Sequence, residues 1–271
     1  MKKWLLILSL CLASCLASTS LAADFEPFAG PKPLVVWIQS DPWAMVIGAD
    51  TPRVAIYEDG RAVFLRKTGK FWSYRTVLLA PKSLAGVKMH LRPVLALKTL
   101  KSHYNISPGI TDQPEAMLYL REGTHEAATN VYGLMTTGTR LPAYTVMPSS
   151  SKATMPPAEV LKLHQWLSTL NFAGSQEWKP RYTEMILWDY SYAPQASIHW
   201  PKAWPSLTSN RAVKRKSSSS IFLDTSLMPQ VEKLMKGRKE KGALEMDGKK
   251  WAVSFRPIFA SEPLWRRAFA H

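Results

Sequence analysis

The residue types best suited to ligand binding gather between positions 178 and 216. Tryptophans and tyrosines alternate with prolines over residues 178–205, and a basic run follows. An exposed indole can stack on a sugar ring or grip an apolar group, and basic side chains beside it can bind anionic groups. The same rings could instead anchor a core, because aromatic side chains bury large areas. The candidate ligand-binding residues are Trp200, Lys202, Trp204, Arg211, Lys214, Arg215 and Lys216.

The sequence carries no recognisable catalytic motif. There is no G-x-S-x-G nucleophile turn, and Ser149-Ser150-Ser151-Lys152 spells S-x-x-K only inside a serine-rich stretch that indicates a linker. Glycan cleavage needs two facing carboxylates, and the best available set is Asp189 with Glu184 and Asp112. We expect these carboxylates to form hydrogen bonds or ion pairs, and we assign no catalytic residue.

Metal and cofactor sites are not expected either. No two histidines have the spacing of a helical H-E-x-x-H site, and no glycine-rich phosphate loop occurs. His90 and His164 fall in expected helices, where we place them on the polar face or its boundary. We therefore predict no metal ligand and no cofactor.

The first 23 residues are typical of a secretory signal peptide. Lys2 and Lys3 precede an apolar stretch over residues 4–12, and the small residues before Ala23 suit cleavage after Ala22 or Ala23. An alternative is the lipobox pattern Leu12-Ala13-Ser14-Cys15, in which Cys15 would be acylated and would anchor the chain to a membrane. Both cysteines lie in this leader, so the mature chain has no disulfide. We expect a bacterial protein that is periplasmic or secreted.

The charge of the chain is positive and unevenly distributed. The formal net charge is +15, and removal of two leader lysines leaves +13. Residues 24–150 carry 14 basic and 10 acidic side chains, whereas residues 151–271 carry 19 and 10. Such charge can simply keep a protein in solution, or it can attract an anionic envelope polymer or lipid headgroups. No nucleic-acid-binding motif accompanies it, so we do not expect nucleic acid as a partner.

Hairpin signals dominate the mature chain. Asp59-Gly60 lies between two apolar runs, and Asp247-Gly248 does the same near the C-terminus. Apolar residues spaced three and four apart predict helices over residues 82–100, from 156 and over 227–236. We predict an α+β fold with mainly antiparallel sheets and a few packed helices. Its parts are an N-terminal lobe over 24–141, a linker over 142–155 and a basic, tryptophan-rich lobe over 156–271.

The order strand, helix, hairpin occurs twice, over residues 71–133 and 219–255, which suggests two related β-α-β-β lobes. Several motifs also resemble those of a group of uncharacterised exported bacterial proteins. The motifs are Pro52-Arg53-Val54, Tyr57-Glu58-Asp59-Gly60, Thr111-Asp112-Gln113-Pro114 and the closing stretch 247–257 (DGKKWAVSFRP). This resemblance implies bacterial export and an α+β fold, and it implies no catalytic residue.

The sequence leaves three functional hypotheses. The first is a non-enzymatic envelope protein that binds an anionic envelope component, or a partner protein, through its C-terminal lobe. The second is an envelope hydrolase whose site is assembled from residues distant in sequence. The third is a structural or inhibitory module that grips a partner with a sheet edge.

Overall fold

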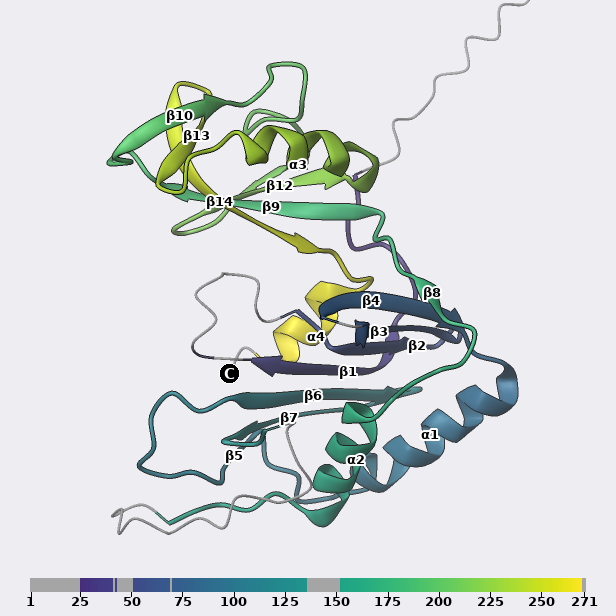
Figure 1. The fold of residues 1–271 in the computed structure, drawn as a ribbon. Coiled ribbons are helices and arrows are strands. Elements are labelled where there is room, and N and C mark those ends of the chain that lie inside the picture. Colours follow the sequence, from purple (N-terminus) through teal and green to yellow (C-terminus); the bar gives the residue numbers. More distant parts are fainter. Residues whose placement is uncertain (1–24, 41, 43–50, 69, 136–151, 270–271) are drawn as a thin grey trace, which may run out of the picture.

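The structure is a computed structural model, and it describes residues 25–40, 42, 51–68, 70–135 and 152–269. Within this part the chain forms two mixed but mostly antiparallel β-sheets with helices packed on their faces (Figure 1). The α+β class expected from the sequence is thereby confirmed.

The larger sheet, sheet A, has eight strands. They are β1 (Pro33–Ser40), β2 (Val54–Tyr57), β3 (Arg61–Thr68), β4 (Phe71–Leu78), β5 (His103–Asn105), β6 (Glu115–Glu122), β7 (His125–Tyr132) and β8 (Gln176–Glu177). Their order across the sheet is β5-β7-β6-β1-β2-β3-β4-β8, and only the edge pair β5–β7 is parallel among the pairings of this sheet. The expected Asp-Gly turn joins β2 to β3, where Gly60 has φ +88° and lies against the backbone of Leu79.

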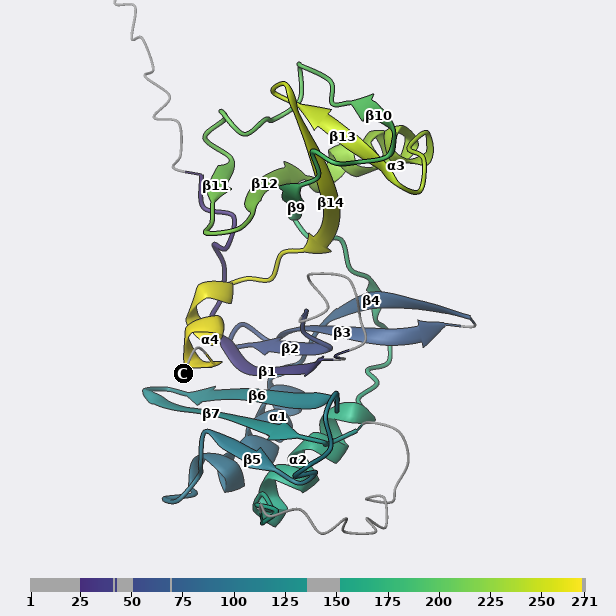
Figure 2. The same ribbon diagram turned by 90° about the vertical axis from the view of Figure 1, so that its left-hand side faces the viewer.

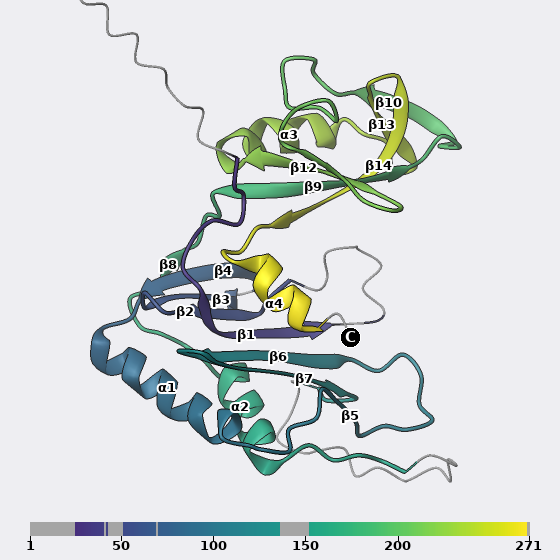
Figure 3. The same cartoon turned by 180° about the vertical axis from the view of Figure 1, so that it is seen from behind.

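Helices cover both faces of sheet A. On one face lie α1 (Pro81–Leu95) and α2 (Ala158–Ser168), and on the other lies α4 (Glu262–Phe269) (Figures 1 and 3). Trp37 of β1 points into the core beneath α1 and α2, while Val36 and Ile38 join the core beneath α4 with Trp265. Both faces of β1 are buried, which agrees with its continuous apolar run from Leu34 to Ile38.

The smaller sheet, sheet B, has six strands and one helix on its outer face (Figure 2). The strand order is β10-β13-β14-β9-β12-β11, with β10 and β13 parallel. Met185, Leu223 and Leu244 of the sheet pack against Val231 of the helix. The elements are β9 (Tyr182–Asp189), β10 (Gln195–His199), β11 (Ala212–Lys214), β12 (Ser219–Asp224), the 3-10 turn η1 (Thr225–Leu227), α3 (Met228–Lys236), β13 (Gly242–Met246) and β14 (Lys249–Pro257).

The packing differs from the lobe boundaries expected from the sequence. Val160, Leu163 and Leu167 of α2 belong to the core of sheet A, as does Trp265 of α4. In the sequence, α2 comes before the long strands of sheet B and α4 comes after them, yet both helices pack on sheet A. A boundary at residue 156 therefore does not match the cores. We call sheet A with α1, α2 and α4 the first lobe, and sheet B with α3 the second lobe. The expected linker at 142–155 lies largely outside the described residues.

The strand–helix–hairpin order recurs, but with different connections. Each hairpin, β6–β7 or β13–β14, lies beside the first long strand of its lobe and carries a parallel strand on its outer edge. In sheet A the inner strand of the hairpin is the first one, β6, whereas in sheet B it is the second one, β14. The lobes therefore share an architecture without sharing a topology.

The segment before β1 runs along both lobes (Figure 3). Phe25 and Phe28 pack edge-on against Tyr182 and Phe222 of sheet B, and the carbonyl of Phe28 accepts a hydrogen bond from Ser261 ahead of α4. The signal peptide, the lipobox and Cys15 lie outside the described residues. None of the helices in the described part is long and apolar enough to cross a membrane.

Candidate functional site

The two tryptophans of the candidate set have different roles. Trp200 is only 6% exposed, and its Nε1 donates a 2.9 Å hydrogen bond to the carbonyl of Pro205. It belongs to the core beneath α3, and this burial does not favour the ligand contact expected from the sequence. Trp204 is half-buried and packs edge-on against Trp200, with 4.9 Å between the ring centroids. Trp200 therefore supports the ring of Trp204, part of which remains accessible to solvent.

The basic residues of the candidate set also divide into two groups. Arg211 pairs with Asp224 and lies over the Phe25 ring at 5.2 Å. The Arg215 guanidinium binds Glu184 at 2.5 Å and the hydroxyl of Ser220 at 3.1 Å. Arg215 is thus held by a buried carboxylate, whereas Arg211 is held by the half-exposed Asp224 and remains partly accessible.

The three lysines of the set are exposed and form no ion pair within the described residues: Lys202, Lys214 and Lys216. Lys214 lies in register with Ser219, while the side chain of Arg215 turns to Ser220 and Glu184 on the face opposite α3. Neighbouring residues of an extended chain point to opposite faces. The basic run 214–216 is consequently not a single patch.

Two adjoining shallow hollows lie where β12 meets α3. One, of about 440 Å³, is lined by Ala203, Trp204, Pro205, Arg211, Asp224, Ser226, Leu227 and Gln230. The other, of about 420 Å³, is lined by Lys179, Pro180, Arg181, Asp224, Thr225, Ser226 and Pro229. Both are open to solvent, and Asp224 and Ser226 belong to both. Two members of the candidate set, Trp204 and Arg211, thus line one hollow.

The register of β9 and β12 builds this site. Asp224 at the end of β12 pairs with Tyr182, and the amide of Thr225 donates to the carbonyl of Arg181 at 3.1 Å. The exposed Arg181 guanidinium lies 5.1 Å over the Tyr182 ring. Asp224, which is paired with Arg211, shares the lining of the two hollows with three cationic side chains: Lys179, Arg181 and Arg211. We call the two hollows together the cationic hollow.

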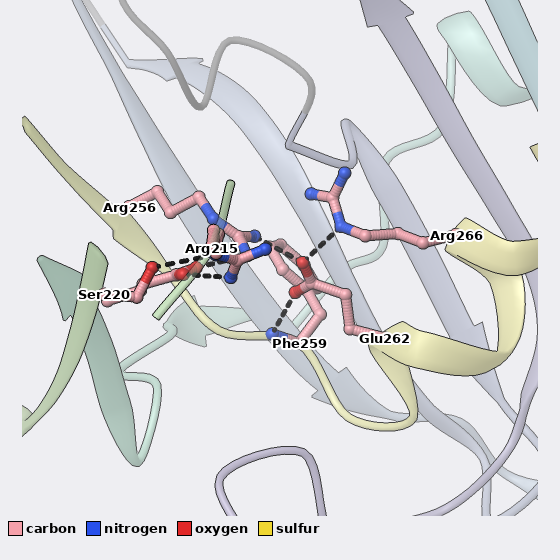
Figure 4. Close-up of polar contacts among 7 residues, drawn as sticks. Arg215, Ser220, Arg256, Phe259, Glu262 and Arg266 are labelled. Carbon is pink, nitrogen blue, oxygen red and sulfur yellow. Dashed lines mark hydrogen bonds and ion pairs between the residues drawn. The ribbon is translucent and has the colours of Figure 1, made fainter. Parts of the chain in front are cut away.

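A buried ion network lies between the lobes (Figure 4). Glu184 is fully buried and pairs with Arg256, which is 6% exposed. Arg256 also binds Glu262 of α4 at 2.5 Å, and Glu262 binds Arg266 at 2.5 Å and accepts from the amide of Phe259 at 3.4 Å. Acidic and basic side chains alternate along this network, so each carboxylate has a cationic partner. The network joins sheet B to α4 of the first lobe.

The carboxylates considered for hydrolysis do not come together. Glu184 and Asp189 lie five residues apart on β9, so they point to opposite faces of sheet B. Asp189 is exposed and binds the hydroxyl of Ser191 at 3.1 Å, while Asp112 lies in a first-lobe loop with φ 56°. Within the described residues, no group of three or more His, Cys, Asp or Glu side chains could hold a metal ion.

The histidine expectations require one correction. His90 is exposed and stacks on Trp166 with ring centroids 4.2 Å apart. His164 is buried at 5% exposure, not placed at a polar boundary, and its Nε2 lies 3.4 Å from Oε1 of Gln39. Burial lowers the pKa of His164 to about 4, with a smaller contribution from the charge of Arg53. The apolar spacing of α2 could have indicated this, because His164 lies four residues after Val160 and three before Leu167, on the buried face of the helix.

The fold and the site define a two-sheet α+β protein with an open cationic hollow on its second lobe. Comparison with known proteins adds no relative: no family model, no curated protein and no solved structure matches the chain.

Proposed function

We propose that the mature chain is a non-enzymatic envelope protein that binds an anionic, glycan-type component of the bacterial envelope in the cationic hollow. The observation that carries this proposal is the shared lining of one hollow by an aromatic ring, Trp204, and a cation, Arg211. A sugar ring stacks on an indole, and its carboxylate or phosphate substituents pair with guanidinium groups.

The binding groups are held in place before a ligand arrives. Trp200 supports the ring of Trp204 from the core, and Asp224 holds the guanidinium of Arg211. The ring of Tyr182 supports Arg181. Groups that are already ordered lose little entropy on binding, so even an open hollow can contribute useful affinity.

The openness of the hollow suits a polymer better than a small molecule. A small ligand in a pocket usually loses most of its surface to the protein, which a shallow surface hollow does not provide. A polymer can instead cross both hollows and contact Ser226 and Gln230 with its hydroxyl groups. The exposed Lys202, Lys214 and Lys216 would add longer-range attraction that weakens with salt.

The proposal is tested with bacterial cell walls freed of lipid by detergent, which separate glycan binding from membrane binding. The mature protein is mixed with them at low and high salt, and the pelleted fraction is measured. We expect salt-sensitive pelleting, and at least about tenfold weaker binding for the double variant Lys179→Glu, Arg181→Glu, because charged hydrogen bonds contribute about 1.5–3 kcal/mol each.

The matched control is Lys98→Glu, Lys101→Glu, which makes the same charge change at exposed positions of the first lobe. It should bind cell walls nearly as the unchanged protein does. Equal losses in both double variants, or no pelleting at either salt, would refute binding in the hollow.

A further inference from the structure

The hairpin formed by β3 and β4 carries two exposed aromatic rings at its tip. The hairpin extends past the helices that cover the rest of sheet A (Figure 2). Phe71 is 78% exposed, the highest value among the large apolar side chains of the described part, and Trp72 is 56% exposed. Two exposed aromatic rings on neighbouring residues of a projecting tip are unusual for a protein surface, and they indicate a contact that has not been made in the isolated chain.

The two rings point to opposite faces of the hairpin. Trp72 is in register with Lys67, and Phe71 is in register with Thr68. Because successive strand residues alternate between faces, Trp72 lies on the α4 side of the sheet and Phe71 on the α1 side. A flat protein surface could cover only one of these faces. A medium that surrounds the tip, such as the interfacial region of a lipid bilayer, can bury both rings together.

The charge of the hairpin specifies which bilayer fits. Between positions 61 and 78 there is no Asp or Glu, and the basic residues there are Arg61, Arg66, Lys67, Lys70 and Arg75. Arg66, Lys67 and Lys70 are exposed near the tip, and the Arg53 guanidinium lies 5.8 Å over the ring of Trp72. Basic residues near a membrane are attracted to anionic lipids, and tryptophan favours the headgroup level.

We propose that the tip of the β3–β4 hairpin inserts into the headgroup region of a membrane that contains anionic phospholipid, with Phe71 and Trp72 as the inserted groups. This lipid contact belongs to the first lobe and is independent of the cationic hollow of the second lobe. A protein that made both contacts would hold a glycan-type polymer close to a membrane surface.

The first test is cosedimentation of the mature protein with vesicles of phosphatidylglycerol and phosphatidylcholine, compared with phosphatidylcholine alone. We expect binding to the anionic vesicles and about 100-fold weaker binding for Phe71→Ser, Trp72→Ser, because the variant removes both inserted rings and the apolar area that the lipid would bury. Lys67→Glu, Lys70→Glu should weaken binding by at least about tenfold. The control Leu78→Ser removes an equally exposed apolar side chain, 72% exposed, at the other end of β4, and should bind normally.

The second test locates Trp72 in the bilayer. Brominated phospholipids quench the fluorescence of indoles that reach the lipid, and the variant Trp72→Phe keeps an apolar ring while removing this fluorophore. The unchanged protein should show a quenched fraction that the variant lacks. The proposal is overturned if the protein binds neither vesicle, if Leu78→Ser weakens binding as much as the tip variant does, or if quenching is the same with and without Trp72.

Discussion

His164 is a titratable side chain held in its neutral form by the core of the first lobe. Its ring packs edge-on against Trp37 with 5.3 Å between the ring centroids, and its Nε2 lies 3.4 Å from Oε1 of Gln39. Burial lowers its pKa to about 4, whereas the same group in an unfolded chain has its ordinary pKa of 6.5. Between about pH 4 and pH 6.5, the imidazole is therefore protonated in the unfolded state and neutral in the folded state.

This difference predicts a specific loss of stability in acid. As pH falls from about 6.5 to about 4, the free energy of unfolding should decrease by up to about 3 kcal/mol through this group alone. Urea unfolding of the unchanged protein and of His164→Gln at several pH values measures the contribution. The variant should lose less stability over this range than the unchanged protein does. Parallel stability curves would show that His164 is not held neutral.

At the residue scale, the sequence identified only part of the candidate site. Trp204 and Arg211 were expected, because an aromatic ring and a cation in a proline-rich stretch are visible in the sequence. Lys179, Arg181 and Asp224 were missed, because only the register of β9 with β12 brings them together. Trp200 and Arg215 were included by type and nearness in sequence, which does not distinguish a buried support from an exposed contact.

Between the elements, the ion network of Glu184, Arg256 and Glu262 connects three segments that are distant in the sequence. Glu184 is on β9, Arg256 is on β14 and Glu262 begins α4. A buried carboxylate without its partner is strongly disfavoured, because the low-polarity interior does not replace its hydration. Arg256 pairs with both glutamates and is itself buried, whereas their other partners, Arg215 and Arg266, are more exposed and bind one glutamate each.

Arg256→Met should lower the free energy of unfolding by about 3–5 kcal/mol, as expected when one partner of a buried ion pair is removed. Arg92→Met is the matched control, because Arg92 forms an exposed ion pair with Glu122 at 2.9 Å and its loss should change stability little. Urea titrations of both variants make the comparison. Similar small effects in the two variants would mean that the network does not stabilise the junction.

Elements with local signals were predicted well, and elements fixed by distant contacts were not. The Asp-Gly turns predicted the hairpins β2–β3 and β13–β14. In the second of these turns, Asp247 and Gly248 have φ values of 53° and 71°. The short edge strands β5, β8 and β10 gave no periodic signal. The apolar residues of α4 share one helix face: Leu264, Trp265, Ala268 and Phe269. Two turns of such a pattern are too short to predict a helix. The place of α2 on sheet A depends on long-range packing, so proximity along the chain assigned it to the wrong lobe.

For the whole molecule, the two proposed contacts lie on different lobes. The hairpin tip belongs to sheet A, and the cationic hollow lies where sheet B meets α3. The excess positive charge expected from the sequence supports both proposals, but charge alone could also produce unspecific attraction to any anionic surface. The central claim is that binding depends on the shape of the hollow as well as on its charge.

The most direct measurement therefore blocks the hollow without changing the charge. Ser226 is exposed and lines both hollows, so Ser226→Trp would fill them, while Ser83→Trp places the same ring at an exposed position on α1. Binding of both variants to lipid-free cell walls is measured at low salt. We predict that Ser226→Trp loses most of the binding and that Ser83→Trp retains it. Undiminished binding of Ser226→Trp would contradict the account and leave only unspecific charge attraction.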